Sequence, residues 1–322
     1  MSSKPRTRRV VVITGASSGI GQATALAFAA EGAVLFLASR NLEAEEAVAR
    51  ECNRLGAEAH ALRADIGEAA EIRTLAETAV SRAGRIDVWV SNAGVGAVGR
   101  FHETPIAAHE QVVRTNLIGH MNDAHAVLPV FLRQRQGVFI NINSLGAFAA
   151  TPFAASYSAS KYGLRGFSEA LRAELRDQPG IHVCDIYPAF VDTPGIAHGA
   201  NHVGRRLTAP PPLLDPRTVA RRIVKVSRHP RPTTMIGVVT PVLRLAHALA
   251  PEATVGTIGR VMKTYFSRAP RVPRSDGNVH TPPATPGGID GGLRQESSLA
   301  TRGAVAAGCV LGVLLARRLI RG

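Results

Sequence analysis

The sequence predicts a doubly wound α/β fold, in which helices cover both faces of a parallel sheet. Short apolar runs alternate with helix-period stretches, and this alternation is typical of parallel strands joined by right-handed helical crossovers. The 322 residues and the 45% hydrophobic content are ample for one large α/β domain. The predicted strands are residues 10–14, 34–38, 60–64, 87–91, 137–141, 182–187 and 234–239.

Helical stretches and loops set the expected domain boundaries. Helices are predicted over 21–31, 42–55 and 106–135, with a kink at Pro129. The proline-rich stretch RRLTAPPPLLDP (205–216) predicts an irregular flap that closes over a site. We expect a basic N-terminal tail (1–8), one domain over 9–266 with a helical extension (241–266), a Pro/Gly-rich linker (267–298) that lacks bulky apolar groups, and an apolar, arginine-flanked tail (299–322).

Basic charge is concentrated in the C-terminal part of the chain. Residues 1–195 hold 19 Lys and Arg against 19 Asp and Glu, whereas residues 196–322 hold 19 against 5, so the net charge of +14 belongs to the second segment. Such a segment favours an anionic surface, and a solvated basic face is the other reading. The aromatic content of 5%, without basic and aromatic residues interleaved, argues against a nucleic-acid partner.

The last residues leave two readings open. Residues 303–316 are uncharged and mostly apolar, and as a helix they would be about 21 Å long, against a hydrocarbon core of about 30 Å. Arg317, Arg318 and Arg321 favour a membrane surface, and Gly308 with Gly312 has the spacing that lets helices approach closely. The tail therefore contacts a membrane surface or is buried against protein, such as a partner subunit.

Cysteine usage and the N-terminus indicate a reducing compartment. Cys52, Cys184 and Cys309 show no paired spacing, so neither a disulfide framework nor a cysteine-based zinc site is indicated. The first apolar run, residues 10–13, is too short for the core of a secretory signal. We expect a cytoplasmic protein, with membrane association through the tail left open.

A glycine turn follows the first predicted strand and opens the first predicted helix. In VVVITGASSGIGQ, Gly15 permits the tight turn, Gly19 lets backbone approach a pyrophosphate, and Gly21 lets the helix pack on the sheet. The helix N-terminus then presents free amides to a phosphate. We expect a dinucleotide site whose loop also includes Ser17, Ser18 and Ile20.

The residue at the end of the second strand indicates the nucleotide. NAD sites normally carry Asp or Glu there, but this chain has Arg40, and a guanidinium suits a 2′-phosphate. NADP(H) is therefore the expected cofactor, with NAD(H) second; a surface arginine that starts a helix is the structural alternative. Asp65, followed by Ile66, is placed to bind adenine or to cap the next helix.

Tyr157 and Lys161 lie one turn apart on a predicted helix, in YSASK. At this spacing their Cβ atoms are within about 6 Å, and an ammonium beside a phenol is expected to lower the tyrosine pKa from about 10. Tyr157 is then a usable general acid or base. Ser144, at the end of the fifth strand, can polarise a substrate carbonyl in the same pocket. The alternative is an exposed helix pair with no catalytic role.

Taken in this order, the motifs resemble those of the short-chain dehydrogenase/reductase family, with a C-terminal extension. The matching features cover residues 10–239 and include TGASSGIG (14–21), NAG (92–94), Ser144 and YSASK (157–161). The resemblance implies a Rossmann fold and hydride transfer between a nicotinamide and a carbonyl or carbinol carbon. It implies that Tyr157 exchanges the proton, Ser144 holds the substrate oxygen, Lys161 binds ribose hydroxyls and Asn116 positions a water.

The resemblance also adds cofactor contacts and shows two departures. Ala189 stands where the family usually has Gly, and Asn143 replaces the more usual serine before Ser144. A methyl group at residue 189 is expected to narrow the nicotinamide pocket or to shift the loop that carries it. The implied cofactor contacts are Asn92, Ala93, Gly94, Tyr157, Lys161, Pro188, Val191 and Thr193.

Two further signals bear on ligands. His198 and His202 have the i, i+4 spacing of metal ligands, but no third ligand is evident, so we expect no metal. We expect an NADP-preferring carbonyl reductase or alcohol dehydrogenase that forms a homo-oligomer; the alternative is a membrane-tethered NADP-binding scaffold with vestigial catalysis. An apolar small-molecule substrate is suggested by Leu145, Phe153, Phe190 and Ile196, which are equally compatible with the core.

Overall fold

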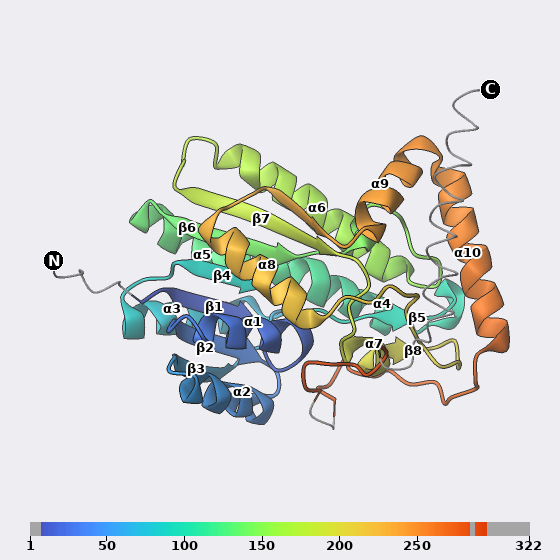
Figure 1. Cartoon of the computed structure of the whole chain (residues 1–322), viewed down its shortest axis with the longest axis horizontal. Helices are drawn as coiled ribbons and strands as arrows, with labels where there is room; N and C mark the ends of the chain where they lie inside the picture. The colour runs from blue at the N-terminus through green and yellow to red at the C-terminus, as the bar shows by residue number, and fades with distance from the viewer. Residues whose placement is uncertain (1–7, 284–286, 295–322) are drawn as a thin grey trace.

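Seven parallel strands form the centre of the molecule in the order β3-β2-β1-β4-β6-β7-β9 (Figure 1). The structure is a computed structural model that describes residues 8–283 and 287–294. All seven predicted strands are present, and their ends differ from the prediction by at most three residues. They are β1 (Val10–Thr14), β2 (Val34–Ser39), β3 (Glu58–Arg63), β4 (Val88–Ser91), β6 (Gly137–Ile142), β7 (Ile181–Pro188) and β9 (Thr233–Ile236).

Helices cover both faces of this sheet, as the sequence predicted. Side chains alternate along β1, so Val11 and Ile13 pack in one core cluster and Val10 and Val12 in the other. The first face carries α1 (Gly19–Ala29), α2 (Leu42–Arg54) and α8 (Pro216–Arg228). The second carries α3 (Ala69–Ala83), α5 (Gly119–Gln134) and α6 (Ala155–Glu174). The doubly wound fold is confirmed.

The strand order reverses between β1 and β4. The chain runs from β1 outward through β2 to β3, then returns to place β4 on the other side of β1. In open α/β sheets, ligands bind outside the carboxyl ends of the strands at such a reversal. Gly15 follows β1 and Asn92 follows β4, so the predicted nucleotide loop lies at this point.

The long helix predicted over 106–135 is interrupted at a different place. It consists of α4 (Ile106–Val113), a π-helical turn η2 (Arg114–Ile118) and α5, and α5 continues through Pro129. The helix continues through Pro129, and the kink expected there stays a prediction. The prolyl ring frees the carbonyl four residues earlier, and that residue, His125, is exposed, so water can bond to it. The π turn instead contains Asn116, one of the predicted site residues.

The C-terminal helical extension is two helices rather than one. α9 (Val239–Leu249) and α10 (Pro251–Arg268) are separated at Ala250, whose φ of −148° and ψ of 72° are not helical. The residue before a proline is disfavoured in the helical region, which explains the break.

In the proline-rich stretch, residues 206–213 contain neither helix nor strand. Small elements that the sequence did not predict are β5 (Ala97–Val98), η1 (Phe101–Glu103), η3 (Leu145–Ala147), α7 (Gly195–His198) and β8 (Ala200–Asn201).

The stretch predicted to be a Pro/Gly-rich linker lies against the domain. Residues 269–283 and 287–294 have no helix, and they run along the carboxyl edge of the sheet beside α7 and β8, as the orange-to-red coil of Figure 1 shows. The apolar tail (299–322) and residues 1–7 of the basic N-terminal tail lie outside the described residues. Among the residues that are described, no helix combines the length and the apolar character needed to cross a membrane.

Candidate functional site

The glycine loop and the NAG segment are packed directly on each other. A Cβ on Gly15, whose φ is +68°, would lie 2.6 Å from the Ala93 Cα atom, and a Cβ on Gly21 would lie 2.0 Å from the Gly15 carbonyl oxygen. The Asn92 Nδ2 atom donates to the Gly15 oxygen at 2.8 Å. Side chains at either glycine would separate the loop from this segment, so the predicted nucleotide residues 15–21 and 92–94 form one unit.

The N-terminus of α1 opens toward the same edge. Ser18 is the N-cap residue, but its side chain makes no capping bond, and Gly19 has a φ of +54°. Thr193 packs on this turn, because a Cβ on Gly19 would lie 3.2 Å from Thr193. Val191 is buried and pairs with Leu214 of the proline-rich stretch. The loop after β7, which begins beyond Pro188, therefore meets the glycine loop.

Glu45 of α2 is buried beneath this loop, and the sequence reasoning missed it. The amides of Ala16 and Ser17 and the Ser39 hydroxyl face its carboxyl group, which is fully shielded from solvent. Within the described part of the chain, none of them bonds the carboxyl oxygens with ordinary hydrogen-bond geometry. Burial therefore dominates and raises the pKa of Glu45 to about 8.

Arg40 follows β2 at the predicted position, but backbone carbonyls bind its guanidinium. It donates to the oxygens of Asn278 at 2.6 Å, Val279 at 3.1 Å and His280 at 3.2 Å. These carbonyls belong to the segment that the sequence assigned to a linker.

Asp65 and Ile66 lie at the end of β3. The Asp65 Oδ1 atom accepts from the Gly67 amide at 2.8 Å, which closes a local turn. The N-cap residue of α3 is Glu68, so the structural alternative of Asp65 as the helix cap was wrong. Ile66 is buried, and a Cβ on Gly119 would lie 2.7 Å from its Cγ1 atom, so its side chain packs on the start of α5.

Ser144 and Tyr157 flank a single glycine. Ser144 caps the short helix η3 after β6, and its Oγ atom accepts from the Gly146 amide at 3.1 Å. A Cβ on Gly146 would lie 3.4 Å from Tyr157 Cε1 and 3.6 Å from Ser144 Oγ. The structure thus brings the two predicted hydroxyl groups together at the carboxyl end of β6.

Lys161 lies near the Tyr157 ring and binds a backbone carbonyl. Its Nζ atom is 5.9 Å from the ring centroid and donates to the Ile142 carbonyl at 3.0 Å. Burial raises the pKa of Tyr157, and the contact with Ser144 opposes this rise. The expected lowering of the tyrosine pKa by the ammonium was wrong for this arrangement. Burial also lowers the pKa of Lys161 to about 8, against the attraction of Asp185.

Asn116 is fully buried in the π turn and binds the loop after β4. Its Oδ1 atom accepts from the Val95 amide at 2.8 Å, and its Nδ2 atom donates to the Val95 carbonyl at 2.8 Å and to Ser160 Oγ at 3.3 Å. Ser160 Oγ in turn donates to the Tyr157 carbonyl at 2.7 Å. Asn116 therefore connects the NAG segment with the helix that carries Tyr157.

A buried polar chain runs behind the site, and the sequence reasoning missed it. His120 Nδ1 contacts Asn141 Oδ1 at 2.9 Å, and Asn141 Nδ2 donates to Ser168 Oγ at 2.9 Å. Ser168 Oγ donates to Asp185 at 2.7 Å, and the Arg172 guanidinium donates to the same carboxylate at 2.9 Å. The chain joins α5, β6, α6 and β7 and ends at the partly exposed arginine.

Helical spacing could have revealed His120 of this chain and the separate buried carboxyl group of Asp123. His120 and Asp123 follow Asn116 at i+4 and i+7, so the three side chains share one face of the helical segment. Burial lowers the pKa of His120 to about 3 and raises the pKa of Asp123 to about 7. Asp123 accepts from Ser91 Oγ at 2.6 Å and from Thr14 Oγ1 at 2.9 Å, at the ends of β4 and β1.

The predicted substrate-side residues are dispersed around the carboxyl edge. Leu145 is buried, Phe190 and Ile196 are partly buried, and Phe153 packs edge-on against Phe266 of α10 with ring centroids 5.3 Å apart.

The two histidines suggested by metal-ligand spacing lie near the C-terminal segment. The Nε2 atom of His202 is 3.4 Å from the Asp276 carboxylate, while His198 lies in α7. In the described ranges, no three His, Cys, Asp or Glu side chains are grouped as metal ligands.

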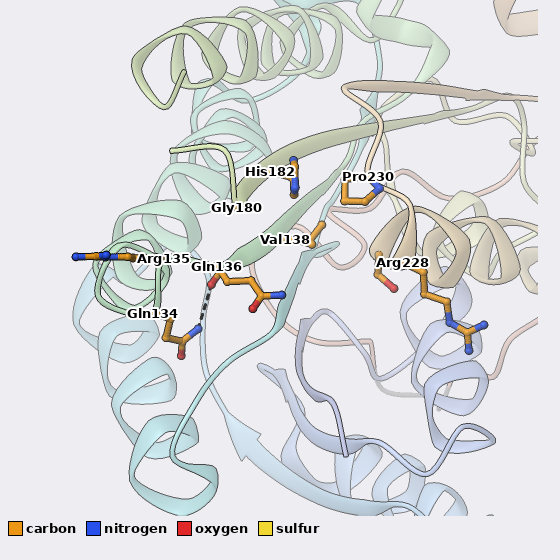
Figure 2. A pocket seen from close by; sticks show the side chains of 9 residues that line it. Gln134, Arg135, Gln136, Val138, Gly180, His182, Arg228 and Pro230 are labelled. Atoms are coloured by element: carbon orange, nitrogen blue, oxygen red, sulfur yellow. Dashed lines mark hydrogen bonds between the residues drawn. The ribbon is translucent and has the colours of Figure 1, made fainter. Parts of the chain in front are cut away.

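Two open hollows of the surface lie away from these residues. One of about 340 Å³ is at the amino ends of β6 and β7, where Gln134, Arg135, His182 and Arg228 line it (Figure 2). Another of about 320 Å³ lies beside α2 and β3. Neither is lined by a predicted site residue. The glycine loop and the Tyr157 region are instead covered by the C-terminal segment.

Known proteins share both the sequence pattern and the fold. The profile of the family described as short chain dehydrogenase matches residues 9–201. An uncharacterised oxidoreductase of Bacillus subtilis, YxnA, is 30% identical over 276 residues, which are 84% of this chain and 78% of that protein.

Solved structures with bound nucleotides are similar as well. An alcohol dehydrogenase from Thermococcus sibiricus, complexed with 5-hydroxy-NADP, aligns with a TM-score of 0.63 and 26% identity over 71% of this chain and 96% of that one. A short chain dehydrogenase/reductase from Burkholderia phymatum, in complex with NAD, has the same fold, with a TM-score of 0.64 and 24% identity over 85% of this chain and 100% of that one. These similar structures include one with an NADP derivative and one with NAD. The family profile and the relative in Bacillus subtilis show that the chain is an oxidoreductase of the short-chain dehydrogenase/reductase family.

Proposed function

We propose that this chain transfers a hydride between NADP(H) and a carbonyl or alcohol carbon of a small apolar substrate, with Tyr157 as the general acid or base. The observation that carries the proposal is the pairing of Ser144 and Tyr157 around Gly146, with Lys161 one turn further along α6. Two hydroxyl groups that face one space can both bond a single substrate oxygen.

The residues at the reversal of strand order fit a nicotinamide dinucleotide. Gly15 and Gly21 leave no room for a side chain, and the uncapped N-terminus of α1 presents amides that suit a pyrophosphate. The Arg40 guanidinium at the end of β2 suits the 2′-phosphate of NADP through forked hydrogen bonds. When bound, the reduced nicotinamide supplies a hydride to a carbonyl carbon, and the oxidised form accepts one from a carbinol.

Side chains of the protein supply the proton and stabilise the reacting oxygen. Burial raises the pKa of Tyr157, so the phenol is protonated at neutral pH and can donate to a carbonyl oxygen during reduction. Ser144 holds that oxygen by a hydrogen bond. Lys161 remains largely charged at neutral pH, because its pKa is about 8, and its ammonium is placed one turn along α6 to bind the ribose hydroxyls of the cofactor. Asn116 fixes the loop after β4 relative to α6.

Replacing Tyr157 tests the assignment. Oxidation of NADPH is followed by absorbance with a panel of apolar ketones, and Tyr157→Phe is expected to lower kcat by about 10² to 10⁴-fold. Tyr162→Phe is the matched control, since Tyr162 lies on the same helix and its hydroxyl group contacts His247 at 3.4 Å. Equal turnover by Tyr157→Phe and the parent chain would show that the phenol is not the proton donor.

The same panel addresses the alternative of a nucleotide-binding scaffold with vestigial catalysis. Tight NADPH binding without turnover of any carbonyl would favour the scaffold.

We also propose that residues 299–322 contact an anionic membrane surface, because the positive charge is concentrated in residues 196–322. Cell fractionation with and without 299–322 tests this contact, and an unchanged distribution would contradict it. Light scattering tests the proposed homo-oligomer.

A further inference from the structure

The C-terminal segment lies over the residues that the proposed function assigns to the dinucleotide. We call residues 269–283 and 287–294 the strap. It leaves α10, pairs with β8 through the Ser275 and Asn201 backbones at 2.8 and 3.0 Å, and continues along the carboxyl edge of the sheet (Figure 1). The strap therefore lies along the edge of the sheet that carries the glycine loop.

The strap uses the guanidinium proposed to bind the 2′-phosphate. Arg40 donates three hydrogen bonds to the carbonyl oxygens of Asn278, Val279 and His280. A guanidinium has five N–H donors in one plane, and forked recognition of a phosphate needs two that point the same way. Both terminal nitrogens of Arg40 donate to strap carbonyls, so this pair of nitrogens cannot bind a phosphate while the strap is in place.

The strap also uses the amide proposed to bind the pyrophosphate. The Gly19 amide at the N-terminus of α1 donates to the Gly288 carbonyl at 2.8 Å. The approach is close, since a Cβ on Gly287 would lie 2.8 Å from the Ser18 Cβ atom. A peptide carbonyl thus occupies the position at which this helix end would bind a phosphate oxygen.

In the stretch of the strap that binds Arg40, one apolar side chain packs near Tyr157. Val279 has no exposed surface and packs in a cluster with Val95, Ala97, Val112 and Ala200, against which Tyr157 also lies. Residues on both sides of Val279 are exposed or partly exposed. The Val279 side chain is therefore the part of this stretch that is buried in the domain, and its burial stabilises the strap in the closed position.

Ion pairs fasten the far end of the strap. The Arg294 guanidinium contacts the carboxylates of Asp192 at 3.1 Å and Asp215 at 2.9 Å, and the Leu293 amide donates to Asp192 at 2.9 Å. Both terminal nitrogens of Arg217 donate hydrogen bonds to the Asp290 carboxylate, each at 2.9 Å. Asp192 stands between the predicted cofactor contacts Val191 and Thr193, so this fastening attaches directly to the loop after β7.

We infer that the strap is an intramolecular competitor of the dinucleotide, so that it must leave the cleft before NADP(H) can bind. The inference rests on the proposed function, because the Arg40 side chain and the Gly19 amide are the groups that both ligands require. The apparent dissociation constant then equals the intrinsic one divided by the fraction of molecules with the strap open. Release of the strap is a built-in control of cofactor access.

Truncation gives the direct test. NADPH binding is measured by calorimetry for the full chain, for a chain that ends at Arg268, and for one that ends at Arg294 and keeps the strap. The chain ending at Arg268 is expected to bind about tenfold more tightly, the effect of a strap that is open about one-tenth of the time. The chain ending at Arg294 is the control and is expected to bind like the full chain.

Point variants of the full chain test the same inference even where the shorter chain does not fold. Val279→Asp places a carboxylate in the apolar cluster, and Arg294→Ala removes the ion pairs at the far end; both are expected to tighten NADPH binding several-fold. Arg268→Ala, which removes the same charge outside the strap, is expected to leave it unchanged. Trypsin cleavage after Arg274, within the strap, is expected to accelerate when the full chain is saturated with NADPH.

Each other outcome overturns the inference in a distinguishable way. Equal affinity of all the proteins would show that the strap does not compete, while the proposed function stands. Weaker binding by the truncated chain, with slower cleavage in the presence of NADPH, would make the strap a lid that closes over the bound cofactor. Absence of NADPH and NADH binding by every protein would refute the proposed function, and the competitor with it.

Discussion

The buried carboxyl of Glu45 predicts how stability depends on pH. Glu45 lies beneath the glycine loop with no exposed surface, and burial raises its pKa from 4.5 to about 8. Between these values the folded chain retains a proton that the unfolded chain has released. The free energy of unfolding therefore falls as the pH rises through this window, and the loss is complete above about pH 8.

The size of the effect follows from the pKa difference. A tenfold change in proton affinity is about 1.4 kcal/mol, so a rise from 4.5 to about 8 corresponds to at most about 5 kcal/mol. Relaxation of the surroundings of an ionised buried group lowers this cost, so we expect about 2 to 4 kcal/mol. Glu45→Gln keeps the shape and polarity of the protonated group but removes the titration.

Urea unfolding at several pH values measures the difference. Glu45→Gln and the parent chain are expected to be similarly stable near pH 5, whereas near pH 9 the variant is expected to be more stable by about 2 to 4 kcal/mol. Asp123, whose pKa is also raised, to about 7, contributes equally to both proteins and cancels. Glu46→Gln, an exposed neighbour, is the control. Parallel pH profiles for Glu45→Gln and the parent would refute the assignment of a buried, protonated Glu45.

Three further predictions concern the site. Gly21→Ala is expected to lower NADPH affinity more than tenfold and to reduce the melting temperature, because a Cβ there would lie 2.0 Å from the Gly15 oxygen; unchanged calorimetric binding would contradict this packing. Asp185→Asn is expected to move the alkaline limb of the kcat/KM profile to lower pH, since Asp185 raises the pKa of Lys161; an unmoved limb would leave Asp185 a purely structural role. Arg40→Ala, measured in the chain that ends at Arg268, is expected to lower the NADPH-to-NADH preference in kcat/KM by about 10 to 100-fold, and a constant ratio would exclude Arg40 as the 2′-phosphate ligand.

Local sequence patterns predicted the fold and much of the arrangement of the site. Five of the seven strands were found because each is a short apolar run that is almost wholly buried, while β3 and β9 at the two edges of the sheet are only partly buried. The alternation of strands and helices along the chain implies parallel crossovers. The glycine loop, Ser144 and Tyr157 were found because each lies at the end of a strand or start of a helix, where a parallel sheet gathers side chains at one edge. The π turn at Asn116 was missed, since no residue type specifies it.

Electrostatic environment was harder to predict than position. The i, i+4 spacing placed Lys161 beside Tyr157 correctly, but its effect on the phenol depends on the direction of the ammonium and on burial. In the structure the ammonium binds the Ile142 carbonyl and desolvation dominates, so the pKa of Tyr157 rises. The same holds for Glu45, which reads as an ordinary helix-surface residue in the sequence and is buried only because α2 packs under the glycine loop.

The parallel sheet, the glycine turn after its first strand and the strand-end serine with its helical tyrosine could be predicted from the sequence, because each leaves a local pattern: an apolar run, a glycine spacing or an i, i+4 pair. Only the tertiary structure showed that residues 278–280 bind Arg40, about 239 positions away. Those contacts use backbone carbonyls, which every residue carries, so no sequence pattern predicts them. A proline- and glycine-rich segment that looks unable to fold alone can still be held in place by a domain that offers it arginines, free amides and an apolar pocket.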